Sequence, residues 1–124
     1  MSKKILVVDD DNLIRESVIV MLKGFGHEVV DADNGLKGLA KALEVHPDLV
    51  ITDIRMPELD GLGMVAKIRE DEWGKTVPII ILTNDETTDA INHALESGVT
   101  VYLSKVHLDP QTLSQQLVLA LGDG

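Results

Sequence analysis

The chain contains no cysteine, which excludes disulfides, thiol catalysis and cysteine-ligated metals and is typical of the reducing cytosol. It also lacks a charged leader followed by an apolar stretch, and no run approaches the ~18 apolar residues of a membrane helix. Basic residues are few, 11 against 21 acidic ones, and a net charge of −10 argues against nucleic-acid binding, which needs a basic face. We therefore expect a cytoplasmic protein with no membrane insertion and no direct contact with nucleic acid.

Aromatic residues are also scarce, since the 124 residues include one Phe, one Trp and one Tyr. Hydrophobic residues nevertheless make up 44% of the chain, so the core must consist almost entirely of Val, Ile, Leu and Ala. No internal repeat, low-complexity tract or Pro- or Ser-rich linker divides the sequence, and its length fits one domain of ordinary size. We expect residues 1–124 to form a single domain.

Short aliphatic runs alternate with stretches of helical periodicity along the whole chain. This alternation is typical of βαβ units, so it predicts an α/β domain with a parallel sheet covered on both faces. The expected strands lie near 4–8, 27–32, 48–53, 77–82 and 100–104, and the expected helices near 12–23, 35–45, 62–70, 86–97 and 110–121. Six residues mark helix ends: the N-caps Asn12, Asn34 and Asp109 and the stops Gly24, Gly26 and Gly98.

Four of the aliphatic runs end in residues that can handle a phosphoryl group. These residues are the pair Asp9 and Asp10, the lone Asp53, the hydroxyl of Thr83 and the amine of Lys105. The carboxyl ends of parallel strands lie on one edge of the sheet, where open α/β sheets bind ligands. Asp53 lies 43 residues after Asp10, Thr83 lies 30 residues after Asp53, and Lys105 lies 22 residues after Thr83. Each of these spacings matches one or two βα units. We therefore place the functional site at this edge.

Crowded carboxylates at such an edge require a cation, because two like charges ~4 Å apart repel by ~4 kcal/mol at an effective dielectric near 20. A site with few carboxylate ligands suits Mg²⁺, for which Mn²⁺ can substitute. A carboxylate such as Asp53 can accept a phosphoryl group when the charge of that group is neutralised, here by the metal and Lys105. The hydroxyl of Thr83 could then donate to a phosphate oxygen.

Simpler interpretations apply to several residues taken singly. Asp11 is most simply a helix cap, and a lone lysine such as Lys105 is ordinarily a solvated surface residue. Arg55 is most simply a rim residue, and Met56 and Met64 are most simply core residues. A functional site is favoured because the residues at the ends of the four aliphatic runs all lie at the same edge of the sheet, and not because of any one residue. Four residues share neither spacing nor neighbouring ligands and are expected in surface or packing positions: His27, His46, His93 and His107.

Four segments together resemble a known family: VVDDD at 7–11, TDIRMPELDG at 52–61, IIILT at 79–83 and YLSK at 102–105. They span most of the chain, and their combination is far more specific than Asp-Asp or Met-Pro alone. The sequence resembles the response-regulator receiver domain of bacterial two-component signalling. The resemblance implies a flavodoxin-like (βα)5 fold whose five-stranded parallel sheet has the order 2-1-3-4-5.

The resemblance also implies a role for the residues at the sheet edge. Asp53 is the implied phosphoacceptor, with Lys105 as its cationic partner. Asp10 and Asp53 would ligate Mg²⁺ directly, Asp9 would act largely through water, and the backbone carbonyl of Arg55 would complete the protein ligands. The implied phosphodonor is a histidine kinase or a histidine phosphotransfer protein.

A switch pair is implied in the same way. Thr83, which also belongs to the catalytic group, would move toward the phosphate, and the ring of Tyr102 would turn inward into the vacated space. The surface that changes comprises the helix 86–97, the strand 100–104 and the helix 110–121. A downstream protein, or a second copy of this chain, would bind there.

The sequence departs from the family pattern at the loop after the last strand. The family's Lys-Pro step, with its cis peptide, is Lys105-Val106 here, and a cis bond before a non-proline residue costs ~2.5–4 kcal/mol. We therefore expect a trans bond, with Lys105 still reaching Asp53 through its long side chain. Separately, Arg55 and Asp85 could pair across the mouth of the site or remain two solvated charges.

The leading hypothesis is a phosphorylation-controlled binding module that takes a phosphoryl group from a phosphohistidine onto Asp53 and hydrolyses it slowly, rather than a metabolic enzyme. The alternative is a Mg²⁺-dependent phosphatase like the haloacid dehalogenases. It would use Asp9 and Asp11, and it leaves Asp53 and the Met-Pro turn unexplained. A flavin or nucleotide binder would need a Gly- or Ser/Thr-rich loop after the first strand, where acidic residues would repel phosphate.

Overall fold

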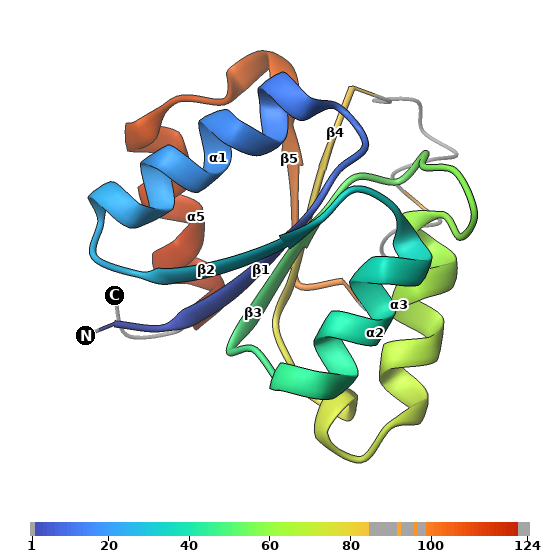
Figure 1. Ribbon diagram of the computed structural model, residues 1–124. Coiled ribbons are helices and arrows are strands. Elements are labelled where there is room, and N and C mark those ends of the chain that lie inside the picture. Colours follow the sequence, from blue (N-terminus) through green and yellow to red (C-terminus); the bar gives the residue numbers. More distant parts are fainter. Residues whose placement is uncertain (1, 85–91, 93–95, 97–98, 122–124) are drawn as a thin grey trace.

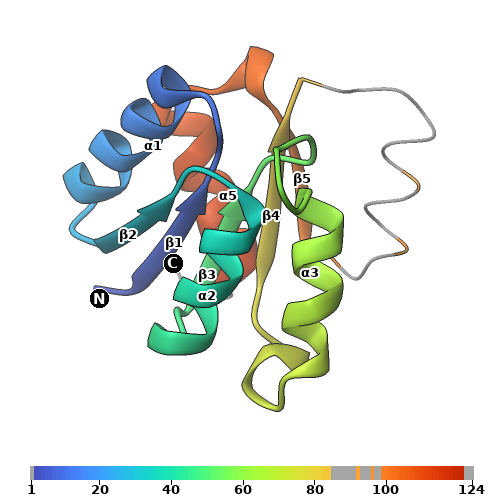
Figure 2. The ribbon, with the colours of Figure 1, turned by 45° about the vertical axis from the view of Figure 1, so that its right-hand side comes forward.

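The computed structural model describes residues 2–84, 92, 96 and 99–121. Five parallel strands form one sheet in the order β2-β1-β3-β4-β5 (Figure 1, Figure 2). The strands are β1 (Lys4–Val8), β2 (Glu28–Ala32), β3 (Leu49–Thr52), β4 (Ile79–Thr83) and β5 (Val101–Ser104). The predicted fold class and strand order are thus confirmed. The expected strand 77–82 starts later because Pro78 has no N–H to donate to a neighbouring strand.

Helices cover both faces of the sheet (Figure 1). On one face lie α1 (Asn12–Gly24) and α5 (Pro110–Leu121), and on the other lie α2 (Gly35–Val45) and α3 (Gly61–Glu70). Two short 3-10 helices follow, η1 (Trp73–Lys75) and η2 (Lys105–His107). The expected helix 86–97, apart from residues 92 and 96, and the expected stop at Gly98 lie outside the described residues. Within the described residues, no helix is both long and apolar enough to span a membrane.

The core consists of two aliphatic layers, one on each face of the sheet. Successive strand residues point to opposite faces, so each central strand supplies side chains to both layers and is buried throughout. The layer under α1 and α5 contains Ile5, Val7, Val18, Leu22, Leu49, Ile51, Ile80, Leu82, Leu103, Leu113 and Leu117. The layer under α2 and α3 contains Leu6, Val8, Ala32, Ala42, Val50, Met64, Val65, Ile68, Val77 and Ile79. Met64 is fully buried, and Met56 packs partly buried against this second layer.

The first helix corrects one of the expected N-caps. Asp11, not Asn12, caps α1, because its backbone is extended and its carboxylate accepts from the N–H groups of Leu13 and Ile14 at 3.0 and 3.2 Å. Asn12 lies inside the helix. The simpler interpretation of Asp11 is therefore confirmed. The helix also continues through Gly24, one residue beyond the expected end.

Other helix ends follow the expected chemistry. Asn34 Oδ1 accepts from the N–H of Lys37 at 2.9 Å, and Asp109 Oδ1 accepts from the N–H of Thr112 at 2.7 Å. Gly26 has a φ of 92°, the left-handed conformation that glycine adopts readily after a helix. The third helix begins at Gly61 rather than at 62, because Asp60 caps it.

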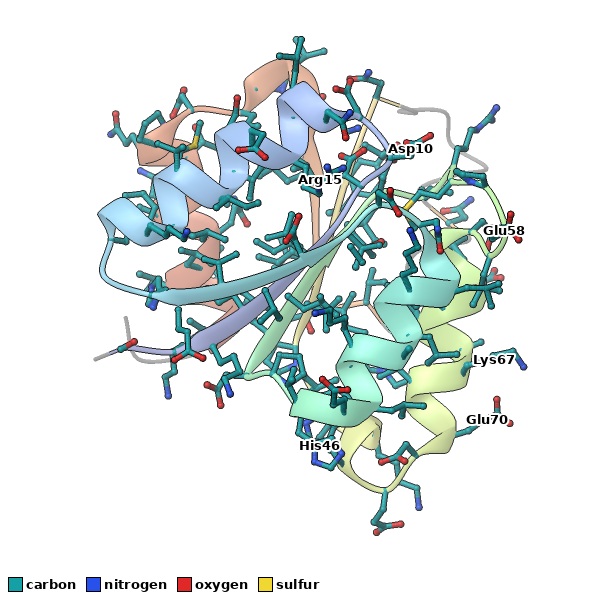
Figure 3. All side chains as sticks on the ribbon, in the orientation of Figure 1. Asp10, Arg15, His46, Glu58, Lys67 and Glu70 are labelled. Carbon is teal, nitrogen blue, oxygen red and sulfur yellow. The ribbon has the colours of Figure 1, made fainter. Side chains whose placement is uncertain are left out.

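The rings of His46 and Trp73 form an aromatic stack at the amino-terminal edge of the sheet. Trp73 lies in η1 before β4, as expected, and its ring stacks on that of His46 with centroids 4.8 Å apart. Figure 3 shows His46 at the end of α2 away from Asp10. His27 accepts a hydrogen bond from the N–H of Lys3 at 3.1 Å, and His107 is exposed. These positions match the surface and packing roles expected for the histidines, while His93 lies outside the described residues.

Candidate functional site

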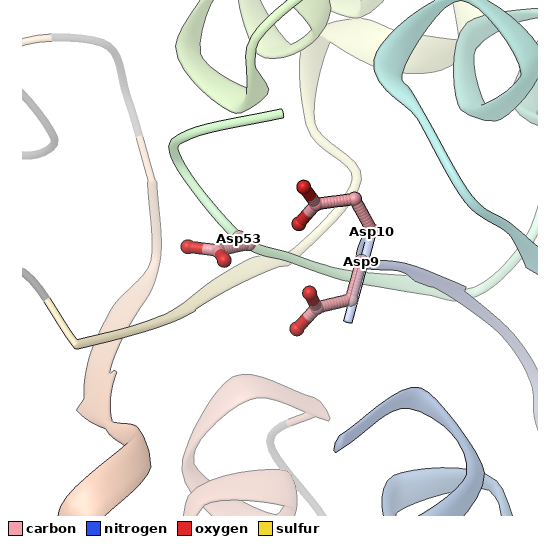
Figure 4. A group of neighbouring side chains, drawn as sticks. All are labelled: Asp9, Asp10 and Asp53. Carbon is pink, nitrogen blue, oxygen red and sulfur yellow. The ribbon is translucent and has the colours of Figure 1, made fainter. Parts of the chain in front are cut away.

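Three carboxylates meet at the carboxyl edge of the sheet. Asp9 and Asp10 follow β1, and Asp53 follows β3, which pairs with β1 so that the N–H of Asp53 donates to the carbonyl of Val8 at 3.1 Å. One oxygen from each carboxylate lies within 4.8 Å of the others. Figure 4 shows the three side chains extending to the same side. Asp9 and Asp53 are buried, at 2% and 8% exposed, whereas Asp10 is exposed.

Lys105 joins two of these carboxylates. Its Nζ donates to Asp53 Oδ2 at 2.8 Å and lies 2.9 Å from Asp9 Oδ2, and its side chain is only 6% exposed. The expectation that Lys105 reaches Asp53 is confirmed. The contact with Asp9 is a buried ion pair, and within the described residues Lys105 Nζ is the one close partner of Asp9 Oδ2. Asp9 Oδ1, in contrast, accepts from the N–H of Asp11 at 2.9 Å.

The protonation equilibria of this pair follow from its burial. Burial raises the pKa of the Asp9 carboxyl above its usual value, because the contacts with Lys105 and the N–H of Asp11 do not outweigh the desolvation of the charge. For Lys105, burial alone would lower the pKa, but the contacts with Asp53 and Asp9 outweigh it and raise the pKa. Lys105 is therefore a fixed positive charge, while the charge on Asp9 is costly without a further cation.

These carboxylates fit a divalent cation. A hard metal ion binds carboxylate oxygens, and Mg²⁺ in particular is held by a small number of them and keeps several waters. The buried Oδ2 of Asp9 contacts Lys105 and, as a carboxylate oxygen, can accept a further contact, and the exposed Asp10 leaves one side of the cluster open to solvent. Asp9, Asp10 and Asp53 therefore supply both the ligand type and the open positions that such an ion requires.

The backbone around Asp53 fixes the direction of its carboxylate. Oδ1 accepts from the N–H of Ile54 at 2.7 Å, which leaves Oδ2 for Lys105. The carbonyl of Asp53 accepts from the hydroxyl of Thr52 at 2.9 Å. Gly61 packs directly on the Asp53 carbonyl, and its N–H donates to the carbonyl of Ile54 at 2.7 Å. The start of α3 therefore holds the Asp53 peptide from outside the site.

Gly61→Ala is expected to destabilise the fold by roughly 1–3 kcal/mol, because the added methyl group would overlap the Asp53 carbonyl oxygen and only backbone movement can relieve that overlap. Urea denaturation measures the loss. Gly24→Ala is the matched control, since a methyl group there meets nothing within 4 Å and Ala favours a helix. Equal stability of the Gly61→Ala variant and the wild type would contradict the close approach.

A shallow cavity of about 350 Å³ opens beside Asp53 and is lined also by Arg55, Thr83 and Asn84. Thr83 ends β4 and is 2% exposed, whereas Arg55 is exposed, in keeping with a rim residue. The structure thus brings the Asp53 carboxylate, the Thr83 hydroxyl and Arg55 to one opening large enough for a phosphoryl group. The question of an ion pair between Arg55 and Asp85 lies outside the described residues.

Thr83 and Tyr102 lie on the same face of the sheet. Tyr102 pairs in register with Ile81, two residues before Thr83, and side chains two residues apart share a face. The ring of Tyr102 is partly buried and packs against the small cluster of Ile54 and Ile81. The two residues of the expected switch pair are therefore neighbours on the face that carries α3.

The loop after β5 contains a trans Lys105–Val106 bond, as expected, since no cis peptide occurs among the described residues. The N–H of Val106 donates to Ser104 Oγ at 3.2 Å at the start of η2. A proline at this position would have no N–H to make this bond. The valine therefore stabilises the loop through a contact that the family's usual residue cannot form.

Val106→Pro is expected to lower the unfolding free energy by about 0.5–1.5 kcal/mol, the worth of the lost hydrogen bond, while leaving phosphodonor labelling of Asp53 intact. Amide chemical shifts of His107 and Leu108 should change. Ser104→Ala removes the same bond from the other side and should cost a similar amount. Loss of labelling in Val106→Pro would show that Lys105 depends on this loop.

Two residues near the site escaped the analysis of the sequence. Gly61 was part of the family-like segment 52–61 but received no role. Arg15 lies in the first turn of α1, and its guanidinium donates to the carbonyl of Asp9 at 2.7 Å. The sequence does contain a signal for Arg15, which is its position near the start of an expected helix. A cation there is opposed by the helix dipole and therefore needs a specific partner.

The phosphatase alternative receives no support from this geometry. It requires Asp9 and Asp11 to act together, but the exposed Asp11 carboxylate is occupied as the cap of α1. The cluster of three carboxylates contains Asp53 in its place.

Known proteins resemble this chain in both sequence and structure. The chain is 37% identical over 122 residues to chemotaxis protein CheY1 of Helicobacter pylori, covering 96% of this chain and 97% of that protein. The structure of Vibrio cholerae chemotaxis protein CheY4 is similar at a TM-score of 0.91 and 33% identity, covering 98% of this chain and 100% of that one.

A further solved structure is the receiver domain of sensor histidine kinase PA1611 from Pseudomonas aeruginosa PAO1, which has a magnesium ion coordinated in its active site cleft. It is similar at a TM-score of 0.91 and 28% identity, covering 99% of this chain and 100% of that one. The family model of the response regulator receiver domain matches residues 5–118. This chain therefore belongs to the response regulator receiver domain family.

Proposed function

We propose that Asp53 is the phosphoacceptor of this receiver domain. The observation that carries the proposal is the hydrogen bond from Lys105 to Asp53 Oδ2 inside a cluster of three carboxylates. An oxygen of Asp53 attacks the phosphorus of a phosphohistidine, and the bond from phosphorus to the imidazole nitrogen breaks with its electron pair on the nitrogen. The donor is a histidine kinase or a histidine phosphotransfer protein, and water later hydrolyses the acyl phosphate slowly.

The cation of this site is proposed to be Mg²⁺, with Mn²⁺ as a possible substitute. Asp10 and Asp53 would hold it directly, Asp9 would act largely through water, and the carbonyl of Arg55 would complete the protein ligands. The cluster supports this arrangement, because one cation, Lys105, faces the two buried carboxylates of Asp9 and Asp53, and the exposed Asp10 lies beside them. When bound, the ion neutralises charge on the transferring phosphoryl group.

Two residues of this chain act on the phosphoryl group itself. Lys105, already a fixed cation against Asp53, neutralises the phosphate from the side of β5. Thr83 lines the cavity beside Asp53 and donates its hydroxyl to a phosphate oxygen. Movement of Thr83 toward the phosphate then alters the packing of Tyr102 on the same face.

The surface that changes on phosphorylation is proposed to include β5, α5 and the segment 86–97, and to bind a downstream protein or a second copy of the chain. Val118 and Leu119 on α5 support this assignment, because they are 47% and 67% exposed although apolar. The proposal assigns residues 1–124 to one domain. A cytoplasmic location stays a prediction.

The test of this function is a reaction with acetyl phosphate and Mg²⁺ followed by peptide mapping with mass spectrometry. We expect one phosphoryl group, on the peptide that contains Asp53, and no labelling when EDTA replaces the metal. Labelling at another residue would contradict the assignment of the acceptor.

Mg²⁺ is expected to stabilise the folded chain by ~2.7 kcal/mol at a concentration one hundred times its dissociation constant, because it binds the folded carboxylates and relieves their repulsion. Thermal melting with increasing Mg²⁺ measures this effect. Trp73 fluorescence should change little, since the ring lies at the opposite edge of the sheet. An equal rise in melting temperature in the Asp10→Ala, Asp53→Ala double variant would place the metal elsewhere.

A further inference from the structure

The guanidinium of Arg15 connects three elements next to the acidic cluster. Its Nη1 donates to the backbone carbonyl of Asp9 at 2.7 Å, its Nη2 to Asn12 Oδ1 at 2.6 Å, and its Nε to Asp31 Oδ2 at 3.0 Å. These acceptors belong to the turn after β1, to α1 and to β2. Figure 3 shows Arg15 and Asp10 at the same edge of the sheet.

The position is an unfavourable one for a cation. Arg15 lies in the first turn of α1, where the helix dipole repels positive charge, and its side chain is only 12% exposed. Burial of an arginine requires compensation by directed hydrogen bonds, and the three acceptors supply it. The planar fork of the guanidinium can reach all three at once, which an ammonium group cannot do.

The carbonyl that Arg15 holds belongs to the peptide between Asp9 and Asp10. A change of ψ at Asp9 or of φ at Asp10 would move this carbonyl and shift the Asp10 carboxylate relative to that of Asp9, and these carboxylates repel each other and Asp53. Two other hydrogen bonds hold the backbone N–H and the carboxylate of Asp9. The N–H donates to the carbonyl of Ala32 at 3.2 Å, and Oδ1 accepts from the N–H of Asp11 at 2.9 Å. Arg15 adds the contact to the carbonyl itself, without using a carboxylate of the cluster.

We propose that Arg15 is a positioning residue for the metal site, which fixes the peptide between Asp9 and Asp10 so that their carboxylates converge with Asp53 on the cation. This inference rests on the proposed Mg²⁺ site and adds a residue that touches neither the ion nor the phosphoryl group. Residues that orient metal ligands from behind commonly alter metal affinity by 10–100-fold when replaced.

Charge and position predict opposite effects of removing this side chain. Arg15→Met removes a positive charge near the cation, so electrostatics alone would tighten Mg²⁺ binding. If Arg15 holds the turn, the same substitution weakens binding instead. Arg15→Lys keeps the charge but loses the planar fork, so it should also weaken binding. Lys37→Met is the matched control. Lys37 and Arg15 line one surface cavity, but the ammonium group of Lys37 forms only an exposed ion pair, with Asp33 at 3.3 Å.

The experiment is calorimetric titration with Mg²⁺ of the wild type and these three variants, with urea denaturation in EDTA run in parallel. We expect at least tenfold weaker Mg²⁺ binding in Arg15→Met and clearly weaker binding in Arg15→Lys. Lys37→Met should bind as the wild type does or slightly more tightly. Denaturation shows that each variant is folded at the titration temperature, and Arg15→Lys provides the test if Arg15→Met is not.

Unchanged or tighter Mg²⁺ binding by folded Arg15→Met would overturn the inference, even if that variant were less stable in EDTA, since the role would then be structural only. Full wild-type affinity in Arg15→Lys would overturn it as well, because the turn would then not need the three bonds that only the planar guanidinium makes. An incorrect assignment of the Mg²⁺ site would give a different result. In that case the wild type would not bind Mg²⁺, or the wild type and Asp10→Ala would bind it equally tightly.

Discussion

Asp53→Asn is expected to abolish labelling by acetyl phosphate, a loss that exceeds any other single substitution at this site. An amide is not a nucleophile toward phosphorus, so the acyl phosphate cannot form. The substitution is nearly isosteric, and the contact of Oδ1 with the N–H of Ile54 can persist. The measurement is phosphoryl incorporation detected by intact-protein mass spectrometry in the presence of Mg²⁺.

Asp10→Asn is the matched control for this experiment. It removes one carboxylate of the same cluster while leaving Asp53 and its bond with Lys105 in place. Labelling should become slower because the cation binds less tightly, and higher Mg²⁺ should partly restore the rate. Persistent labelling of the Asp53→Asn variant would mean that another carboxylate accepts the phosphoryl group.

Lys105→Met should cost about 3–5 kcal/mol of unfolding free energy in EDTA, because it leaves Asp9 and Asp53 buried without their cation. Methionine keeps much of the side-chain length, so the loss is mainly electrostatic. Mg²⁺ should recover part of the lost stability by supplying a positive charge to the same carboxylates. Urea denaturation with and without Mg²⁺ measures both effects, and labelling of Asp53 should also slow.

Lys75→Met provides the comparison for Lys105→Met. Lys75 Nζ lies 2.9 Å from Glu72 Oε2, the same distance as that from Lys105 to Asp9, but the side chains are 58% and 91% exposed. An exposed pair is worth only ~0–1 kcal/mol, so this variant should be nearly as stable as the wild type. Similar losses in the two lysine variants would show that burial does not govern the Lys105 contacts.

The sequence alone located most of the fold because its local signals are strong. Continuous aliphatic runs marked strands buried on both faces, and the residues after them had to meet at one edge of a parallel sheet. The sequence alone therefore placed five residues together at that edge: Asp9, Asp10, Asp53, Thr83 and Lys105. The strand order came from the family resemblance, since periodicity shows which residues face the core but not which strands are neighbours.

The tertiary structure decided the contacts that depend on the path of a turn. Asp11 and Asn12 are both good helix caps, and only the extended backbone at Asp11 shows which one caps α1. Likewise, the sequence did not show that Lys105 contacts Asp9 as well as Asp53, or that Gly61 packs on the Asp53 carbonyl. Such contacts join residues far apart in the chain and require side-chain directions.

Arg15 is a second residue for which the sequence shows the position and only the tertiary structure shows the contacts. Its place in the first turn of a helix was visible in the sequence and was unfavourable for a cation. Its three acceptors come from the turn after β1, from α1 and from β2, so no local pattern contains them. The residue types and strand ends thus determined the chemistry available at this edge of the sheet, while packing of separate elements determined which groups orient the carboxylates.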